Sequence, residues 1–162
     1  AFARCYPQFR AKNVQLLGLS VDGQYSHLAW VHNIYRMTGI QIPFPIIDDS
    51  SRKVSKLYGM ISDASSPTQT VRAVFIIDPK QELRAVLYYP LTTGRWIPEI
   101  LRIIDALQAT DQHGTPTPAN WLPGKPVVLP PPKTYQELLQ RINDGCSGKY
   151  NCVDWYLCFK GI

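Results

Sequence analysis

The hydrophobic pattern is clearest between residues 71 and 107, and the rest of the chain is organised around this stretch. Val71–Asp78 is almost entirely apolar and rich in β-branched side chains, which is typical of a strand buried on both faces. Pro79–Gln81 supplies a turn, and Leu83–Tyr89 predicts a second strand paired with the first. Apolar residues then recur at helical spacing over 97–107. The stretch therefore predicts a ββα unit, with the helix laid back across the sheet.

The residues before this unit predict alternating helices and strands. Phe2, Cys5 and Phe9 fall on one apolar helical face, although Pro7 lies inside the pattern. The elements expected next are a strand at Val14–Val21, a helix at Tyr25–Met37, a strand at Phe44–Ile47, a helix capped within Asp48–Ser51 and ending at Leu57, and a polar loop at Ser62–Thr70. This order predicts an α/β sheet with an antiparallel edge, from which a front strand and the start of a helix are missing.

A proline-rich arm and a short helix are expected after the core. The chain has 14 prolines, and they crowd into residues 116–132, a segment too apolar to serve only as a linker. Thr134 and Glu137 have the spacing of a capping box, which predicts a helix that ends near Gly145. We therefore expect a core at residues 1–110 and a C-terminal extension at 111–162.

The last segment, Cys152–Phe159, alternates regularly in polarity and predicts a single extended strand. At about 3.3 Å per residue, Cys152 and Cys158 would lie roughly 20 Å apart on this strand. A disulfide requires Cα atoms within about 7 Å, so the two cysteines are not expected to pair with each other while the segment is extended. An aromatic strand at the end of an arm usually packs on another surface, which here could be a second subunit.

Composition and charge narrow the possible partners. With 162 residues, the chain is expected to form one domain with an appendage, and no apolar run approaches the length that spans a membrane. The net charge of +5 is scattered rather than gathered into the basic stripe that binds nucleic acid. Four cysteines without a recognisable export signal indicate a reducing compartment. We expect a cytoplasmic protein that binds neither nucleic acid nor a membrane.

Arg72 is the charged residue that interrupts the first strand of the ββα unit. An arginine in line with Val74 and Ile76 must be paired or directed at an anionic or polar ligand, because burying it alone is too costly. The alternative is an arginine at the rim of the sheet, exposed to solvent. The pattern alone favours neither.

The other cysteines and histidines point to no familiar cofactor site. Cys5 lies on an apolar face and is more readily a small buried hydrophobe than a nucleophile, while His27 and His32 suit surface or capping roles. The three C-terminal cysteines could bind zinc, but metal sites usually use more closely spaced pairs. The chain lacks the CxxC, GxGxxG, P-loop and nucleophile-elbow motifs, which disfavours thioredoxins, nucleotide enzymes and α/β-hydrolases. We expect no cofactor and no metal.

Several blocks of the sequence, taken together, resemble the peroxiredoxins. They are NVQLLGLSVD, SHLAWV, IPFPIIDD, KLYGM, TVRAVFIIDP, LYYPLTTGR, EILRIIDALQ, TPANW and VVLPPP. Their order is that of the family, and they are most similar to the one-cysteine, peroxiredoxin-6-like branch with its long C-terminal extension. The ending YNCVDWYLCF resembles members whose extension holds further redox cysteines. The resemblance implies a thioredoxin-like α/β fold, incomplete at its N-terminus, whose C-terminal arm wraps over a partner in a dimer, with dimers often ringed into decamers.

The resemblance also implies a thiol peroxidase that reduces hydrogen peroxide and organic hydroperoxides through a cysteine sulfenic acid. The family motif Pro-x-x-x-Thr-x-x-Cys is absent and would fall upstream of Ala1, while Cys5 lacks the preceding proline and threonine. We therefore expect either a fragment or processed form, or an inactive relative, and the abrupt start inside a helix favours a missing front. The family arginine that lowers the pKa of the thiol and holds the peroxide matches Arg72, and a supporting arginine matches Arg95.

In extended relatives, the last cysteine of the Cys-x-Asp-Trp-x-x-Cys block attacks the sulfenic acid of the partner subunit. This role falls on Cys158, with Cys152 as its neighbour in the relay and a thioredoxin-like protein or a small thiol as the reductant. Alternatively, both cysteines only pack within an aromatic strand, and Cys146 matches no family role. The competing function is a non-catalytic oligomeric scaffold or holdase with a thioredoxin fold, followed by a zinc-binding extension.

Overall fold

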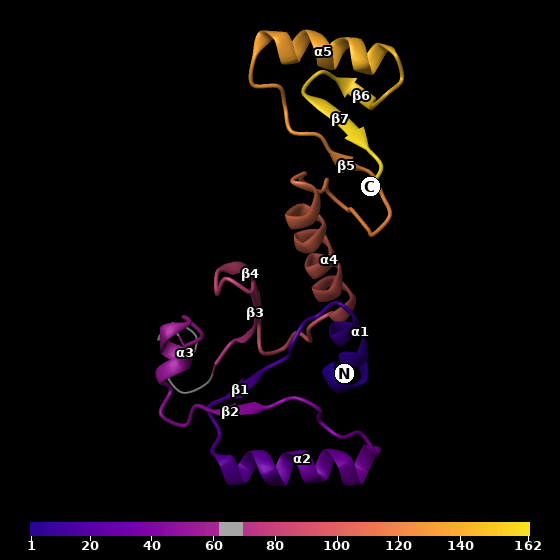
Figure 1. Cartoon of the computed structure of the whole chain (residues 1–162). Helices are drawn as coiled ribbons and strands as arrows, with labels where there is room; N and C mark the ends of the chain where they lie inside the picture. The colour runs from indigo at the N-terminus through magenta and orange to yellow at the C-terminus, as the bar shows by residue number, and fades with distance from the viewer. Residues whose placement is uncertain (62–69) are drawn as a thin grey trace. The chain divides into compact units, whose positions relative to one another are not determined.

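The computed structural model describes residues 1–61 and 70–162 and divides into two compact units, Ala1–Pro98 and Glu99–Ile162 (Figure 1). The first unit contains α1 (Phe2–Ala11), β1 (Gly18–Ser20), α2 (Gln24–Thr38), β2 (Ile46–Asp48), α3 (Lys53–Leu57), β3 (Arg72–Ile77) and β4 (Leu83–Tyr89). The helix α4 (Ile97–His113) begins at the boundary, and the second unit continues with β5 (Val127–Val128), α5 (Tyr135–Cys146), β6 (Asn151–Asp154) and β7 (Leu157–Lys160). The division into a core at 1–110 and an extension at 111–162 stays a prediction.

The predicted order of helices and strands is confirmed through α4, but β1 is much shorter than the strand expected at Val14–Val21. The amide of Val14 donates to the carbonyl of Phe9 at 2.9 Å and so belongs to the end of α1. β1 pairs with β2 in parallel, with Gly18 opposite Ile46. A Cβ at Gly18 would lie 3.3 Å from Cγ1 of Ile46, so the absence of a side chain permits the close approach of the two strands.

The hairpin of β3 and β4 forms as predicted, although β3 is not buried on both faces. The strands are antiparallel, with Arg72 opposite Tyr89 and Phe75 opposite Val86. Every residue of β3 is half-buried or exposed, and Ile77 is 48% exposed. Within the described residues, β3 and β4 form a two-stranded sheet, and this explains why an apolar strand remains partly open.

The short helix α3 is capped from further upstream than its N-cap position. Arg52 occupies the N-cap position with a φ of 58° and makes no capping hydrogen bond with its side chain. The buried carboxylate of Asp49 instead accepts hydrogen bonds from the amides of Val54 at 3.1 Å and Ser55 at 2.7 Å, and from the Ser55 hydroxyl at 2.6 Å. The N-cap position predicted within Asp48–Ser51 is therefore wrong by one residue, but the side chain that accepts the capping hydrogen bonds lies in that range. The polar loop predicted at Ser62–Thr70 lies, except for Thr70, outside the described residues.

The second unit contains an antiparallel sheet in the order β5–β7–β6, beside which α5 lies in contact with β6. The predicted capping box of α5 is confirmed, because Thr134 Oγ1 accepts from the amide of Glu137 at 3.2 Å and Glu137 Oε2 accepts from the amide of Thr134 at 3.3 Å. The helix ends at Cys146, one residue beyond the expected position. The buried apolar residues of this unit are Ile100, Ile104, Trp121, Val127, Leu129 and Cys158.

The single strand predicted at Cys152–Phe159 is wrong, because the segment folds back on itself as the hairpin of β6 and β7. The chain turns at Trp155 and Tyr156, whose rings are 5.5 Å apart and meet edge to face. Asp154 Oδ1 accepts a hydrogen bond from the amide of Trp155 at 2.7 Å, a local bond of the kind that aspartate makes in turns. The turn contains no glycine or asparagine, and its aromatic residues preserve the alternation of a continuous strand.

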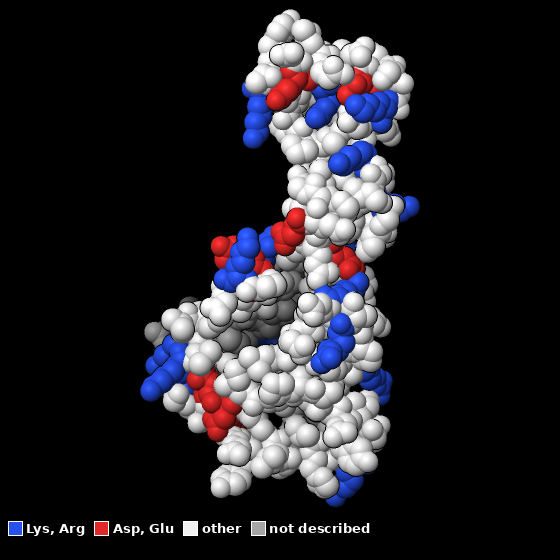
Figure 2. Space-filling view, in the orientation of Figure 1, with Lys and Arg blue, Asp and Glu red and all other residues white. Residues whose placement is uncertain are grey.

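The length and apolarity of the helices and the distribution of surface charge bear on the expectations about membranes and nucleic acids. No helix among residues 1–61 and 70–162 is long and apolar enough to cross a membrane. On the face shown in Figure 2, Lys and Arg are interspersed with Asp and Glu rather than gathered into one patch. The charge pattern on this face therefore matches the scatter seen in the sequence.

Candidate functional site

The first candidate site lies at the first residue of β3 and at the start of the loop that follows β4. Arg72 is half-buried, lies opposite Tyr89 across the two strands, and donates through Nη1 to the carbonyl of Thr93 at 3.2 Å. This bond engages one of the five N–H groups of a guanidinium. The sequence left open whether Arg72 is buried and paired or exposed at the rim of the sheet. The structure lies between the two, since Arg72 is neither fully buried nor free in solvent.

Arg95 brings a second positive charge to the same place. Partial desolvation of its guanidinium lowers the pKa of Arg95 from the ordinary value, the charge of Arg72 lowers that pKa further, and the Tyr89 phenol acts in the opposite direction. Arg95 remains charged at neutral pH, so the folded protein holds two like charges near each other at a cost in free energy. An anion or a polar ligand bound there would recover this cost, and arginine is well suited to such a ligand.

The structure thus brings Arg72 and Arg95 together and adds Tyr89, which sequence reasoning missed. Tyr89 is the last residue of β4, and its register opposite Arg72 was available only once the hairpin pairing was known. The single cysteine of this unit, Cys5, is a free thiol on α1 and is half-buried rather than buried. His27 lies 3.1 Å from the hydroxyl of Ser20, and His32 is exposed.

The second candidate site is a disulfide between Cys152 of β6 and Cys158 of β7. The two residues are direct cross-strand partners with their Cα atoms 4.0 Å apart, so the prediction that they could not pair with each other is wrong. That prediction assumed an extended strand, and the turn at Trp155 removes the assumption. Directly opposed residues of an antiparallel pair have the closest side chains in a sheet, which suits a bond between them.

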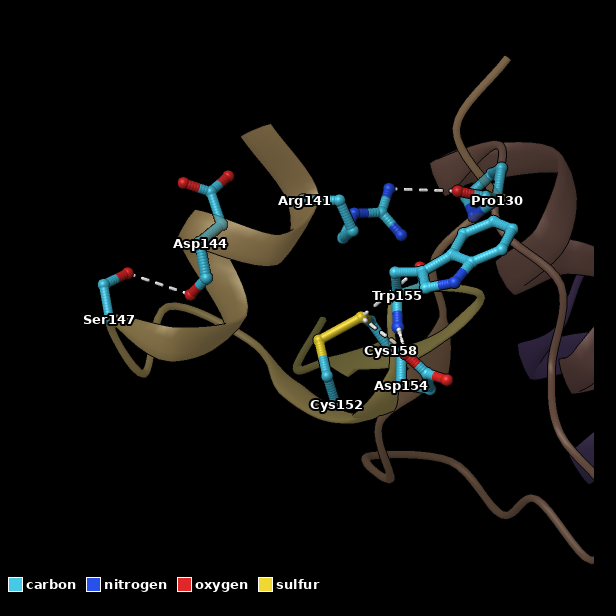
Figure 3. The surroundings of a disulfide bond; sticks show 8 residues. All are labelled: Pro130, Arg141, Asp144, Ser147, Cys152, Asp154, Trp155 and Cys158. Carbon is cyan, nitrogen blue, oxygen red and sulfur yellow. Dashed lines mark hydrogen bonds between the residues drawn. A yellow bond between two sulfur atoms is a disulfide. The ribbon is translucent and has the colours of Figure 1, made fainter. Parts of the chain in front are cut away.

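The two cysteines of this disulfide differ in exposure. Cys158 is 0% exposed, and its sulfur lies 3.4 Å from the carbonyl oxygen of Asp154 and 3.9 Å from that of Trp155. Cys152 is half-buried. In the view of Figure 3, Asp144 lies on the Cys152 side of the bond and Trp155 on the Cys158 side. Cys152 is therefore the more exposed residue of the pair.

Two charged residues of α5, Arg141 and Asp144, lie in the surroundings of the disulfide that Figure 3 shows. The guanidinium of Arg141 donates through Nη2 to the carbonyl of Pro130 at 3.0 Å (Figure 3). It also lies 5.8 Å from the centre of the Tyr150 ring. Lys149 pairs with Asp144 at 3.0 Å, and this bond lowers the pKa of Asp144 and raises the pKa of Lys149. Over the described ranges, no three His, Cys, Asp or Glu side chains are grouped so that they could hold a metal ion.

Family models match both parts of the chain. Residues 1–86 match the AhpC/TSA family, and residues 106–145 match the C-terminal domain of 1-Cys peroxiredoxin. A protein named peroxiredoxin 2 from Caldanaerobacter subterraneus subsp. tengcongensis is 60% identical over 162 residues, which are 100% of this chain and 72% of the relative. This chain belongs to the peroxiredoxin family. A peroxiredoxin from Aquifex aeolicus is 51% identical over 172 residues, covering 100% of this chain and 76% of the relative.

Solved structures agree with this assignment. A yeast mitochondrial 1-Cys peroxiredoxin, described as resolved via glutathione/thioredoxin systems, has a TM-score of 0.84 at 39% identity and covers 99% of this chain and 76% of its own. A cysteine-to-serine mutant of peroxiredoxin 6 from Arenicola marina has a TM-score of 0.78 at 33% identity, covering 98% and 75%. The predicted thioredoxin-like α/β fold is thereby confirmed. Peroxiredoxins are thiol-dependent peroxidases, so the predicted enzyme class is confirmed in preference to a non-catalytic scaffold or holdase.

Proposed function

We propose that this peroxiredoxin reduces hydrogen peroxide and organic hydroperoxides in two stages that use different residues of the chain. Arg72 and Arg95 hold the peroxide and keep a peroxidatic thiol ionised, while Cys158 and Cys152 resolve the oxidised thiol. The disulfide between Cys152 and Cys158 carries the proposal. Two thiols that bond to each other can accept both oxidising equivalents of one peroxide molecule.

In the first stage, a peroxidatic thiolate attacks one oxygen of the peroxide. The O–O bond breaks, the sulfur becomes a sulfenic acid, and water or an alcohol leaves. The Pro-x-x-x-Thr-x-x-Cys motif does not occur in the 162 residues, so none of the four cysteines is assigned this role. The nearby charges of Arg72 and Arg95 support their part, because guanidinium groups favour a thiolate and donate hydrogen bonds to the leaving oxygen.

In the second stage, the hairpin of the reduced protein opens to expose Cys158, whose thiol attacks the sulfenic acid of a partner subunit. This step releases water and forms a disulfide between subunits. Cys152 then attacks the sulfur of Cys158, which releases the peroxidatic thiol and forms the Cys152–Cys158 bond. The cross-strand register supports this last transfer, because the two residues already lie opposite each other. A dithiol protein of the thioredoxin type, or a small thiol, then returns both cysteines to the reduced state.

Mass spectrometry of the natively expressed protein tests this proposal. The reduced protein receives one equivalent of peroxide without reductant, is alkylated, and is then mapped by peptide. We expect peroxide to protect Cys152 and Cys158 from alkylation, with the loss of two hydrogens per disulfide. A Cys152→Ser variant should stop at the disulfide between subunits. If peroxide is consumed while both cysteines remain open to alkylation, the proposed relay is wrong.

The relay needs a second subunit, so we also propose a homodimer that assembles further into a ring such as a decamer. Large apolar side chains of α2 support burial on assembly, since Tyr25 is 86% and Met37 is 70% exposed. A reducing compartment such as the cytoplasm suits the cycle, because the disulfide must be reduced in every turnover. Light scattering after gel filtration, in the oxidised and reduced states, measures the assembly.

A further inference from the structure

Cys146 is the cysteine that the proposed cycle does not use, and it lies in the same unit as the disulfide. It is a free, exposed thiol at the last position of α5. The preceding residue, Gly145, lies directly against the disulfide, since a Cβ at Gly145 would be 3.2 Å from the sulfur of Cys152. The C-terminal end of α5 therefore lies against Cys152, the residue of the pair that is not fully buried.

We propose that Cys146 is a third member of this redox centre and exchanges with the hairpin disulfide. The Cys146 thiolate attacks the sulfur of Cys152, the Cys152–Cys158 bond breaks, and a Cys146–Cys152 bond forms. The electron pair leaves on the sulfur of Cys158, which takes up the proton that Cys146 gave up. Cys146 is oxidised and Cys158 is reduced, so the step needs no further oxidant or reductant.

The exchange would make a poorly accessible disulfide available to an external reductant. An external reductant cannot attack Cys158, which is 0% exposed, and its approach to Cys152 is obstructed by Gly145. The exchange moves the disulfide to Cys146 on the surface and regenerates the Cys158 thiol at the same time. An external dithiol then reduces the Cys146–Cys152 bond to two thiols and becomes a disulfide itself.

The local chain allows the movement that the exchange requires. Glycine weakens a helix, and Gly145 lies in the last turn of α5, where helices fray most readily. A second glycine, Gly148, follows with a φ of 76°, in the left-handed region that ends the helical path. The exchange requires this last turn to unwind so that Cys146 reaches Cys152, and the capping box lies at the other end of α5.

A trapping experiment in the full protein tests the exchange. With Cys158→Ser, diamide should link Cys146 to Cys152, and the linked peptide should be found by mass spectrometry. With Cys152→Ser as the matched control, Cys146 should remain open to alkylation. If Cys146 in the Cys158→Ser protein stays free and no linked peptide forms, the proposal is overturned.

A rate measurement then tests the role of Cys146 in reduction. We expect Cys146→Ser to slow the reduction of the wild-type disulfide by dithiothreitol about tenfold, because a tethered thiol acts at a higher effective concentration than one in solution. An unchanged rate would also overturn the proposal. Because the proposal rests on the redox role of Cys152 and Cys158, the trap uses diamide instead of peroxide. A linked peptide in a protein whose disulfide ignores peroxide would refute the proposed function and leave the exchange standing.

Discussion

The two units of the chain carry opposite kinds of chemistry. The N-terminal unit holds two positive charges, Arg72 and Arg95, near one tyrosine, and its single cysteine is free. The C-terminal unit holds a covalent bond whose Cys158 sulfur is shielded from solvent. The difference suits the two stages of the proposed cycle, since a peroxide site must admit substrate from solvent, whereas a disulfide intermediate benefits from restricted access.

Replacement of Arg72 should have the largest effect and should fall on the peroxide stage alone. We expect Arg72→Ala to lower the rate constant for peroxide consumption about 100-fold, as is typical when a donor to a developing negative charge is removed. Lys80→Ala, in the turn of the same hairpin, is the matched control and should react normally. Reduction of the Cys152–Cys158 disulfide by dithiothreitol should be unchanged. A normal peroxide rate constant in stopped-flow measurements would remove Arg72 from the site.

Replacement of Cys158 should produce the converse pattern. We expect Cys158→Ser to leave the first, single-turnover consumption of peroxide intact while steady-state turnover with a dithiol reductant falls about tenfold or more. Cys5→Ser serves as the control and should retain both rates. Equal losses of single-turnover and steady-state rates in Cys158→Ser would show that the two units do not divide the reaction.

Acid should destabilise the N-terminal unit through Asp49. Burial acts to raise the pKa of this carboxyl, but hydrogen bonds from Ser55, Val54 and Lys53 outweigh it and hold the pKa below the ordinary value of 3.8. The unfolded chain therefore takes up the proton more readily, so this stabilisation is full above the ordinary pKa and is lost as the pH falls through the lower, folded-state pKa. Asp49→Asn should flatten the acid dependence of Tm in calorimetry. An unaltered dependence would mean that other groups set it.

The smallest effect should come from the capping box of the C-terminal unit. We expect Thr134→Ala to reduce the free energy of unfolding by about 1 kcal/mol, because the amide of Glu137 loses its acceptor. Denaturant unfolding with separate probes of each unit measures the change. If both units lose stability together in this variant and in Asp49→Asn, the two units unfold as one cooperative body.

Much of the fold was predictable because local signals and the tertiary structure agree. The order of elements through α4 followed from hydrophobic periodicity, and the capping box at Thr134 followed from spacing alone. The turn at Trp155 was missed because two exposed aromatic residues continued the polarity pattern of a strand. The length of β1 was also overestimated. The amide of Val14 donates a hydrogen bond to the carbonyl of Phe9 at the end of α1, and hydrophobic periodicity does not reveal such bonds.

The candidate site was predictable by residue type but not by geometry. The hydrophobic pattern singled out Arg72, and the family resemblance added Arg95. The register of the hairpin, which the sequence did not give, brings Tyr89 opposite Arg72. The pairing of Cys152 with Cys158 across two strands could not be predicted, because the turn at Trp155 that creates the hairpin was missed. The contact of Gly145 with Cys152 joins two elements and has no signature within either segment.

The short span of the disulfide has a consequence for chain entropy. Its cysteines are separated by 6 positions, so the bond closes a very small loop. In the chain-entropy account, such a loop restricts the unfolded chain by about 2 kcal/mol, against about 4.7 kcal/mol for a loop of 100 residues. Opening the bond therefore costs the fold little conformational restraint. The cross-link therefore adds little to the stability of the extension, which suits the proposed cycle, in which the bond opens and closes at every turnover.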